Sequence, residues 1–168
     1  MARNKNQSDS SIDSGTVIGH VHLKVSDLER SIIFYRDVLG FEVMQRMGKS
    51  AAFLSAGGYH HHIVLNTWES AGGQAPLPGS TGLYHFAILV RNRKELARAV
   101  RRLGEHNWPV DGAADHGVSE AVYLRDPDGN GIEIYTDRPK SQWPKGPDGE
   151  VAMYTHPLDL DMLVKELD

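Results

Sequence analysis

Cysteine is absent from the 168-residue sequence. This excludes disulfide bonds, thiolate nucleophiles and thiolate-bound zinc, so any metal must be held by nitrogen and oxygen donors. No apolar run approaches the length that spans a membrane. The first residues, MARNKNQSDSSIDSG, lack the apolar core of a signal peptide. We therefore expect a cytoplasmic protein without a membrane partner.

An excess of positive charge is also absent. The chain has 18 Lys and Arg against 22 Asp and Glu, a formal net charge of -4. Such a balance gives no bulk attraction to nucleic acid, and we expect no nucleic-acid partner. The basic stretch RNRKELARAVRR, residues 91–102, is interpreted as the solvated face of a helix. A composition of 40% hydrophobic and 24% charged residues is typical of a globular domain.

Hydrophobic periodicity predicts one order of elements twice. A strand, a helix and three short strands are expected, in chain order, over residues 17–25, 26–40, 41–47, 50–56 and 60–66. After a loop rich in Gly and Pro, the same order is expected over residues 83–90, 91–106, 108–115, 120–126 and 131–137. The segment HVHLKVSDLERS at 20–31 aligns with HFAILVRNRKEL at 85–96, which indicates an internal duplication.

This pattern predicts an α+β fold of two tandem βαβββ modules. Module one (residues 16–68) and module two (82–138) are expected to form one domain over 16–138. Residues 1–15 are polar and rich in Ser, and we expect them to be disordered. Residues 139–168 are expected to form a C-terminal extension with a short helix from about Pro157. Its apolar side could cover its own domain or a partner subunit.

A run of three histidines, His60, His61 and His62, lies in the last predicted strand of module one. Histidine is the commonest metal ligand in proteins. Because a strand sends consecutive side chains to opposite faces, at most His60 and His62 could share one ion.

Three less conspicuous polar residues interrupt apolar strands. His20 and His85 lie at equivalent positions of the two modules, and Glu133 lies between Ile132 and Ile134. Each taken singly is compatible with a core histidine or a surface glutamate. If the modules are related by an approximate two-fold axis, however, the two histidines meet near that axis and Glu133 completes the set. Two histidines and one carboxylate form the facial triad of non-haem Fe(II) oxygenases.

The sequence resembles the vicinal oxygen chelate superfamily, which includes glyoxalases, bleomycin-resistance proteins and extradiol ring-cleaving dioxygenases. The resemblance covers residues 17–138 and lies in GHVHLKVSDLERSIIFYRDVLGFEV, YHFAILV and DPDGNGIEIY. The stretch HGVSEAVYLRDPDGNGIE, residues 116–133, is similar to the extradiol dioxygenase signature, from which Ala114 departs. The closest branch is therefore the one that resembles catechol 2,3-dioxygenases. The resemblance also implies that the two modules form a curved mixed sheet around a metal-binding cavity.

The resemblance implies roles for three further residues. Tyr123 is expected to hydrogen-bond the bound substrate, and His116 to line the substrate side of the metal, although a core aromatic and a loop histidine remain alternatives. The acid/base histidine of the family comes from the last strand of module one, which makes His62 a candidate and Asn66 a departure. Members with four protein ligands place the additional ligand near Val64, which cannot coordinate a metal.

The function implied is an Fe(II)-dependent extradiol dioxygenase that cleaves a catechol-like substrate with O2. Mn, Ni or Zn are alternative metals. Another metalloenzyme of the superfamily, such as a glyoxalase-type lyase, an isomerase or a thiol transferase, stays open, as does a ligand-sequestering resistance protein. A homodimer is a further expectation, because members of this superfamily often pair or exchange modules.

Overall fold

The computed structural model describes residues 11–168. Module one contains the elements β1 (Val21–Lys24), α1 (Leu28–Ile33), β2 (Glu42–Met47), β3 (Ala51–Ser55) and β4 (Ile63–Asn66). Module two contains β5 (Phe86–Leu89), α2 (Arg93–Glu105), β6 (Val110–Asp115), β7 (Ser119–Arg125) and β8 (Gly131–Asp137). Helix α1 continues as a π-helical segment over Phe34–Val38. The order βαβββ is therefore confirmed in both modules.

The strands form two mixed sheets rather than one continuous sheet. Their orders are β1-β4-β3-β2 and β5-β8-β7-β6-β9, so the two modules share one topology. In each module the first strand runs parallel to the last, and the other pairs are antiparallel. The predicted α+β class and duplication are confirmed, and the division into two sheets is the detail that periodicity did not reveal.

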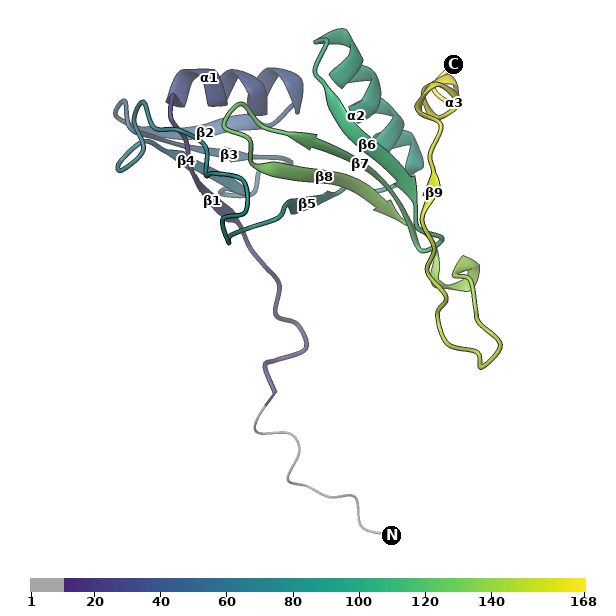
Figure 1. The fold of residues 1–168 in the computed structure, drawn as a ribbon. Coiled ribbons are helices and arrows are strands. Elements are labelled where there is room, and N and C mark those ends of the chain that lie inside the picture. The colour runs from purple at the N-terminus through teal and green to yellow at the C-terminus, as the bar shows by residue number, and fades with distance from the viewer. Residues whose placement is uncertain (1–10) are drawn as a thin grey trace.

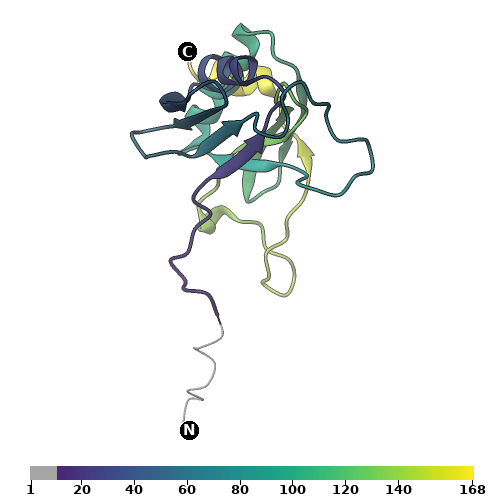
Figure 2. The ribbon, with the colours of Figure 1, turned by 90° about the vertical axis from the view of Figure 1, so that its left-hand side faces the viewer.

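Helices cover one face of both sheets (Figure 1, Figure 2). The apolar side of α1 enters the core, with Leu28 and Ile32 buried. Local side chains begin both long helices: Asp27 accepts a hydrogen bond from the backbone N–H of Arg30 at 3.1 Å, and Asn92 accepts one from Glu95 at 3.0 Å. Such caps satisfy backbone donors that the first helical turn leaves without partners.

Side-chain hydrogen bonds to the turn between β7 and β8 hold the two modules together. The buried hydroxyl of Tyr35 donates a hydrogen bond to Asp126 at 2.9 Å. The carboxylate of Asp128 accepts from the hydroxyl of Ser26 at 2.5 Å and from Arg30 at 2.6 Å. These contacts bind the closing hairpin of module two to helix α1 and its π-helical continuation in module one.

The basic helix α2 places several of its arginines beside carboxylates. Arg98 pairs with Glu95 on the same helix, and Arg93 pairs with Glu120 of β7 at 2.5 Å. Neighbouring opposite charges of this kind agree with the interpretation of this stretch as a solvated helix face. Within residues 11–168, no helix has the length and apolarity needed to cross a bilayer.

Most of the segment predicted to be disordered, residues 1–15, lies outside the described residues. The described part contains a turn, in which the backbone N–H of Gly15 donates to the side chain of Asp13 at 2.8 Å.

The C-terminal extension packs on its own domain, which decides between the two alternatives of the sequence. Strand β9 (His156–Pro157) pairs antiparallel with β6. A short helix, α3 (Leu160–Lys165), then packs against α2, begins three residues later than predicted, and is capped by Asp159. Leu163 of this helix is fully buried in the core.

Replacing Leu163 by Ala tests the contribution of the extension to the core. We expect the free energy of unfolding to fall by about 2–5 kcal/mol, because the change leaves a cavity at a fully buried site. Met162, its neighbour, is 57% exposed, so Met162→Ala is the matched control and should change stability little. Urea denaturation of both variants measures the difference. Equal effects would mean that the extension contributes no more than a surface residue does.

Candidate active site

The centre of the candidate site is a pair formed by His85 and Glu133. His85 directly precedes β5. Glu133 lies in the middle of β8, which pairs in parallel with β5, and it lies opposite Ala87. His85 Nε2 lies 3.0 Å from Glu133 Oε2. Gly131 permits this approach, because a Cβ at that position would lie 2.2 Å from the carbonyl oxygen of Tyr84.

Tyr123 and His116 extend this pair into a row. Tyr123 lies on β7 directly opposite Glu133. Its hydroxyl lies 3.3 Å from Glu133 Oε1 and 2.8 Å from His116 Nε2. The structure thus places the predicted residues His85, Glu133, Tyr123 and His116 in one line across module two.

The phenol of Tyr123 stays protonated over a wide pH range. Burial, followed by the negative charge of Glu133, raises the pKa of Tyr123 from 10.0 to about 12. A protonated phenol at neutral pH is a hydrogen-bond donor. Tyr123 can therefore donate a proton to a neighbouring oxygen or nitrogen throughout the physiological range.

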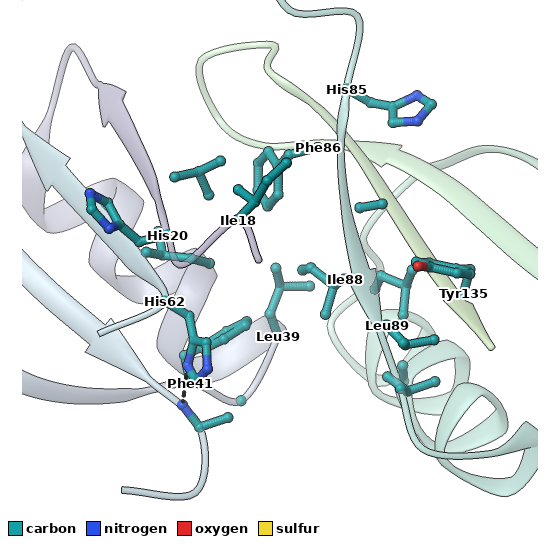
Figure 3. A pocket seen from close by; sticks show the side chains of 18 of the residues that line it. Ile18, His20, Leu39, Phe41, His62, His85, Phe86, Ile88, Leu89 and Tyr135 are labelled. Atoms are coloured by element: carbon teal, nitrogen blue, oxygen red, sulfur yellow. Dashed lines mark hydrogen bonds between the residues drawn. The ribbon is translucent and has the colours of Figure 1, made fainter. Parts of the chain in front are cut away.

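His20, the third predicted metal ligand, lies apart from this row. It directly precedes β1, as His85 precedes β5, so the predicted equivalence of the two histidines holds. Figure 3 shows His20 and His85 on opposite sides of a groove, with the imidazole of His85 pointing away from His20. Within residues 11–168 no group of three His, Asp or Glu side chains is close enough to hold one metal ion. The single chain therefore assembles two of the three predicted ligands.

The groove between the modules is largely apolar and has a volume of about 920 Å³. Apolar residues of both modules line it, among them Ile18, Leu39, Phe41, Phe86, Ile88 and Leu89 (Figure 3). A second pocket, of about 450 Å³, opens beside His85 and Tyr123. Its remaining lining residues are Tyr84, Asp111, Gly112, Leu124, Arg125, Gly131 and Ile132. Both hollows thus reach His85, one from each side.

The histidine run does not lie within a strand, so the alternation argument for it was wrong. Strand β4 begins only at Ile63. The adjacent residues His60 and His61 bring their Nδ1 atoms within 2.9 Å of each other, and the ring of His61 packs edge-on against His20 with centroids 4.7 Å apart. Desolvation, followed by the neighbouring His60, lowers the pKa of His61. The run therefore lies beside His20 in module one.

The two candidates for an acid/base residue in module one are engaged in local hydrogen bonds. His62 Nδ1 accepts from the backbone N–H of Ala56 at 3.3 Å. Asn66 is buried; its Nδ2 contacts His22 Nε2 at 2.8 Å, and its Oδ1 accepts from the backbone of Trp68 at 3.1 Å. His22 was not predicted as part of any site, although its spacing of two residues from His20 could have indicated it.

Val64 occupies the position in module one that Glu133 occupies in module two. In the sheet of module one, Val64 lies between His22 of β1 and Phe53 of β3. Glu133 lies in the same way between a residue of β5 and Tyr123 of β7. The strand register thus agrees with the expectation that Val64 replaces a ligand, and it shows that Phe53 replaces the tyrosine.

The donor atoms of the His85–Glu133 pair fit a divalent metal. Imidazole nitrogen and carboxylate oxygen bind such metals at about 2.1 Å, which places two adjacent ligands roughly 3 Å apart. The observed 3.0 Å between Nε2 and Oε2 matches this value. The pair also has an open side, because the second pocket lies beside His85. No third His, Asp or Glu among the described residues of module two joins this pair.

Comparison with known proteins finds dioxygenases among the relatives of this chain. A catechol-2,3-dioxygenase of Bacillus subtilis is 45% identical over 157 residues, which cover 94% of this chain and 54% of that protein. A manganese-dependent 2,3-dihydroxybiphenyl 1,2-dioxygenase of Geobacillus genomosp. 3 is 28% identical over 79% of this chain and 39% of its own length. The chain thus spans about half the length of these relatives or less.

Solved structures share the fold. A lactoylglutathione lyase of Agrobacterium tumefaciens matches with a TM-score of 0.58 and 28% sequence identity, over 72% of this chain and 93% of its own. Residues 17–134 match the model of one family, described as the Glyoxalase/Bleomycin resistance protein/Dioxygenase superfamily. This match covers both modules, and the protein therefore belongs to the glyoxalase/bleomycin resistance protein/dioxygenase superfamily.

Proposed function

We propose that this protein is a metal-dependent extradiol-type dioxygenase, which cleaves a catecholic ring with O2. The observation that carries the proposal is the row His85–Glu133–Tyr123–His116, in which a pair of metal-compatible donors lies beside a protonated phenol and an imidazole. The 45% identity to a protein named catechol-2,3-dioxygenase supports it further. The site supplies both a place for a metal and groups that can donate and accept a proton.

A glyoxalase-type lyase is the alternative, since a lyase is among the structural relatives. In the superfamily, members with four protein ligands place one in the last strand of module one. That position holds Val64, which is buried and cannot coordinate. The donor set of this chain therefore favours the dioxygenase, in which substrate and O2 need open positions on the metal.

We propose that His85, Glu133 and His20 hold the metal. Fe(II) is the metal we expect, and Mn is an alternative that the name of one relative suggests. When bound, the metal would supply a Lewis acid for the vicinal oxygens of the substrate and a redox centre for O2. His20 would reach His85 and Glu133 either when the modules of one chain close, or from a second copy in a homodimer.

The residues of the row would handle the proton chemistry. The hydroxyl of Tyr123 would hydrogen-bond a substrate oxygen, and His116 Nε2, 2.8 Å from that hydroxyl, would accept or return the phenol proton. The pocket beside His85 and Tyr123 would receive the ring. His62 lines the apolar groove and not this pocket, so it would act as an acid/base residue only if module one closes over the row.

The ligand assignment predicts which variants lose the metal. We expect His20→Ala, His85→Ala and Glu133→Gln to abolish stoichiometric Fe(II) binding under anaerobic conditions, as measured by titration calorimetry and metal analysis. His60→Ala is the control and should bind the metal as the wild type does. The assignment is wrong if His60→Ala loses the metal while His20→Ala retains it.

Mixing two inactive variants distinguishes the two sources of His20. If each site takes His20 from a partner copy, refolding equal amounts of His20→Ala and Glu133→Gln together should restore about a quarter of the wild-type sites, because half of the dimers are mixed and each has one intact site. If His20 acts within its own chain, the mixture should bind no metal.

The dioxygenase activity predicts O2 uptake and formation of a yellow ring-cleavage product when Fe(II)-loaded protein meets catechols. Tyr123→Phe should lower kcat by about 10²–10⁴-fold, because it removes the proton donor, and Tyr135→Phe on the same strand face as Glu133 is the control. Absence of O2 uptake with every catechol, while iron is bound, would contradict the proposal. Turnover of a glutathione hemithioacetal instead would favour the lyase.

The raised pKa of Tyr123 predicts that its phenol loses the proton at a higher pH than an ordinary tyrosine does. In a spectrophotometric titration, the difference between wild type and Tyr123→Phe should develop around pH 12 rather than 10. Since the folded state holds this proton more tightly than the unfolded state, the contribution to stability is complete below pH 10 and is lost as the pH rises towards 12. A difference spectrum with its midpoint near pH 10 would show that neither burial nor Glu133 acts on this phenol.

A further inference from the structure

We propose that the C-terminal extension is part of the candidate active site, where the backbone carbonyl of Tyr154 holds His116 in the tautomer that accepts the proton of Tyr123. The proposal deepens the proposed function and rests on it for the role of Tyr123. The contact between the extension and His116 does not depend on the reaction, and it can be tested separately.

The imidazole of His116 bridges the extension and the row. Its Nδ1 lies 3.2 Å from the carbonyl oxygen of Tyr154 and 3.3 Å from the hydroxyl oxygen of Thr155. Its Nε2 lies 2.8 Å from the hydroxyl of Tyr123. A carbonyl oxygen can only accept a hydrogen bond, and a neutral imidazole has one N–H. Nδ1 therefore carries the hydrogen, and Nε2 presents a lone pair to Tyr123.

The tautomer decides where the single proton of Tyr123 points. With Nδ1–H, the phenol donates to His116 Nε2 across 2.8 Å. With the opposite tautomer, Nε2–H would donate to the phenol oxygen, and the phenol would turn its proton to Glu133 Oε1, 3.3 Å away. In the proposed site Glu133 holds the metal, so the Nδ1–H tautomer leaves its oxygens free for that purpose. The carbonyl of Tyr154 is thus a positioning group for Tyr123.

The extension is held firmly around this contact. The backbone N–H of Tyr154 donates to the carbonyl of His116 at 3.3 Å, so the two residues are joined through both side chain and main chain. Immediately afterwards, His156 pairs with Asp115 in the sheet. Before it, Trp143 Nε1 donates to the carbonyl of Arg138 at 2.8 Å. The segment that carries the carbonyl is therefore attached at both ends.

Gly117 provides the space for the extension beside His116. Its φ of +76° suits glycine, and a Cβ there would lie 2.6 Å from the ring of Tyr154 and 2.8 Å from Pro144. Any larger residue at position 117 would push the extension away from His116. Gly149 is a matched position, because its φ is +80° and a Cβ there would meet no atom within 4 Å.

Nitrogen-15 NMR of the histidine side chains measures the tautomer without any turnover. The protein is labelled and examined free of metal and with Zn²⁺, at about pH 8, where an unperturbed imidazole is neutral. The signal of His116 is assigned from its loss in His116→Gln. We expect Nδ1–H in the wild type and in Thr155→Val, since the carbonyl remains in both. An Nε2–H tautomer in the folded wild type would overturn the proposal.

The glycine pair tests whether the extension sets this tautomer. Gly117→Ala should give a mixture of His116 tautomers. Catechol turnover should fall about 10- to 100-fold, which is the usual effect of removing a hydrogen-bond partner that orients an active-site group. Gly149→Ala, with comparable backbone strain, should keep the Nδ1–H tautomer and its turnover. Tyr154→Pro is a second variant, because it removes the N–H that donates to the carbonyl of His116. It should also give a mixture of tautomers and lower turnover. If both variants fold and retain pure Nδ1–H, the extension does not set the tautomer.

The two readouts separate this inference from the proposed function. If the tautomer behaves as expected while no catechol is cleaved, the function fails and the positioning contact stands. If catechols are cleaved while the tautomer is Nε2–H, the function stands and this inference fails.

Discussion

The attachment of the β7–β8 turn to helix α1 is the interaction on which the arrangement of the molecule depends. Asp126 accepts the buried hydroxyl of Tyr35, and Asp128 accepts from Ser26 and Arg30. Burial, followed by Asp126, raises the pKa of Tyr35 well above its ordinary value, so this hydroxyl remains a donor. The turn leads directly into β8, which means that the position of Glu133 relative to module one is set by this contact.

Within that frame, the two modules have the same topology and different chemistry. The register places His20, Phe53 and Val64 in module one where module two has His85, Tyr123 and Glu133. Module two therefore contains a donor pair and a proton-bearing row, whereas module one has apolar residues at the positions of Glu133 and Tyr123 and shares only the histidine that precedes its first strand. In the proposed metal site, His20 of module one would complete the ligand pair of module two, because two ligands leave the metal sphere incomplete.

The extension adds a third contributor to the same site. Its α3 helix buries Leu163 against α2, and its strand β9 lies along β6. These contacts stabilise the segment that carries the carbonyl of Tyr154, which faces His116. A part of the chain that looks like a stabilising appendage in the sequence is therefore connected, through two hydrogen bonds, to the phenol at the centre of the row.

Local patterns in the sequence were sufficient for the order of the elements and for the duplication, because periodicity depends on residues close together in the chain. Only the tertiary structure decided that the strands form two sheets, that β4 begins after the histidine run, and that His20 lies across a groove from His85. It also brought the extension to His116. Those outcomes depend on how distant surfaces pack, for which periodicity carries no information.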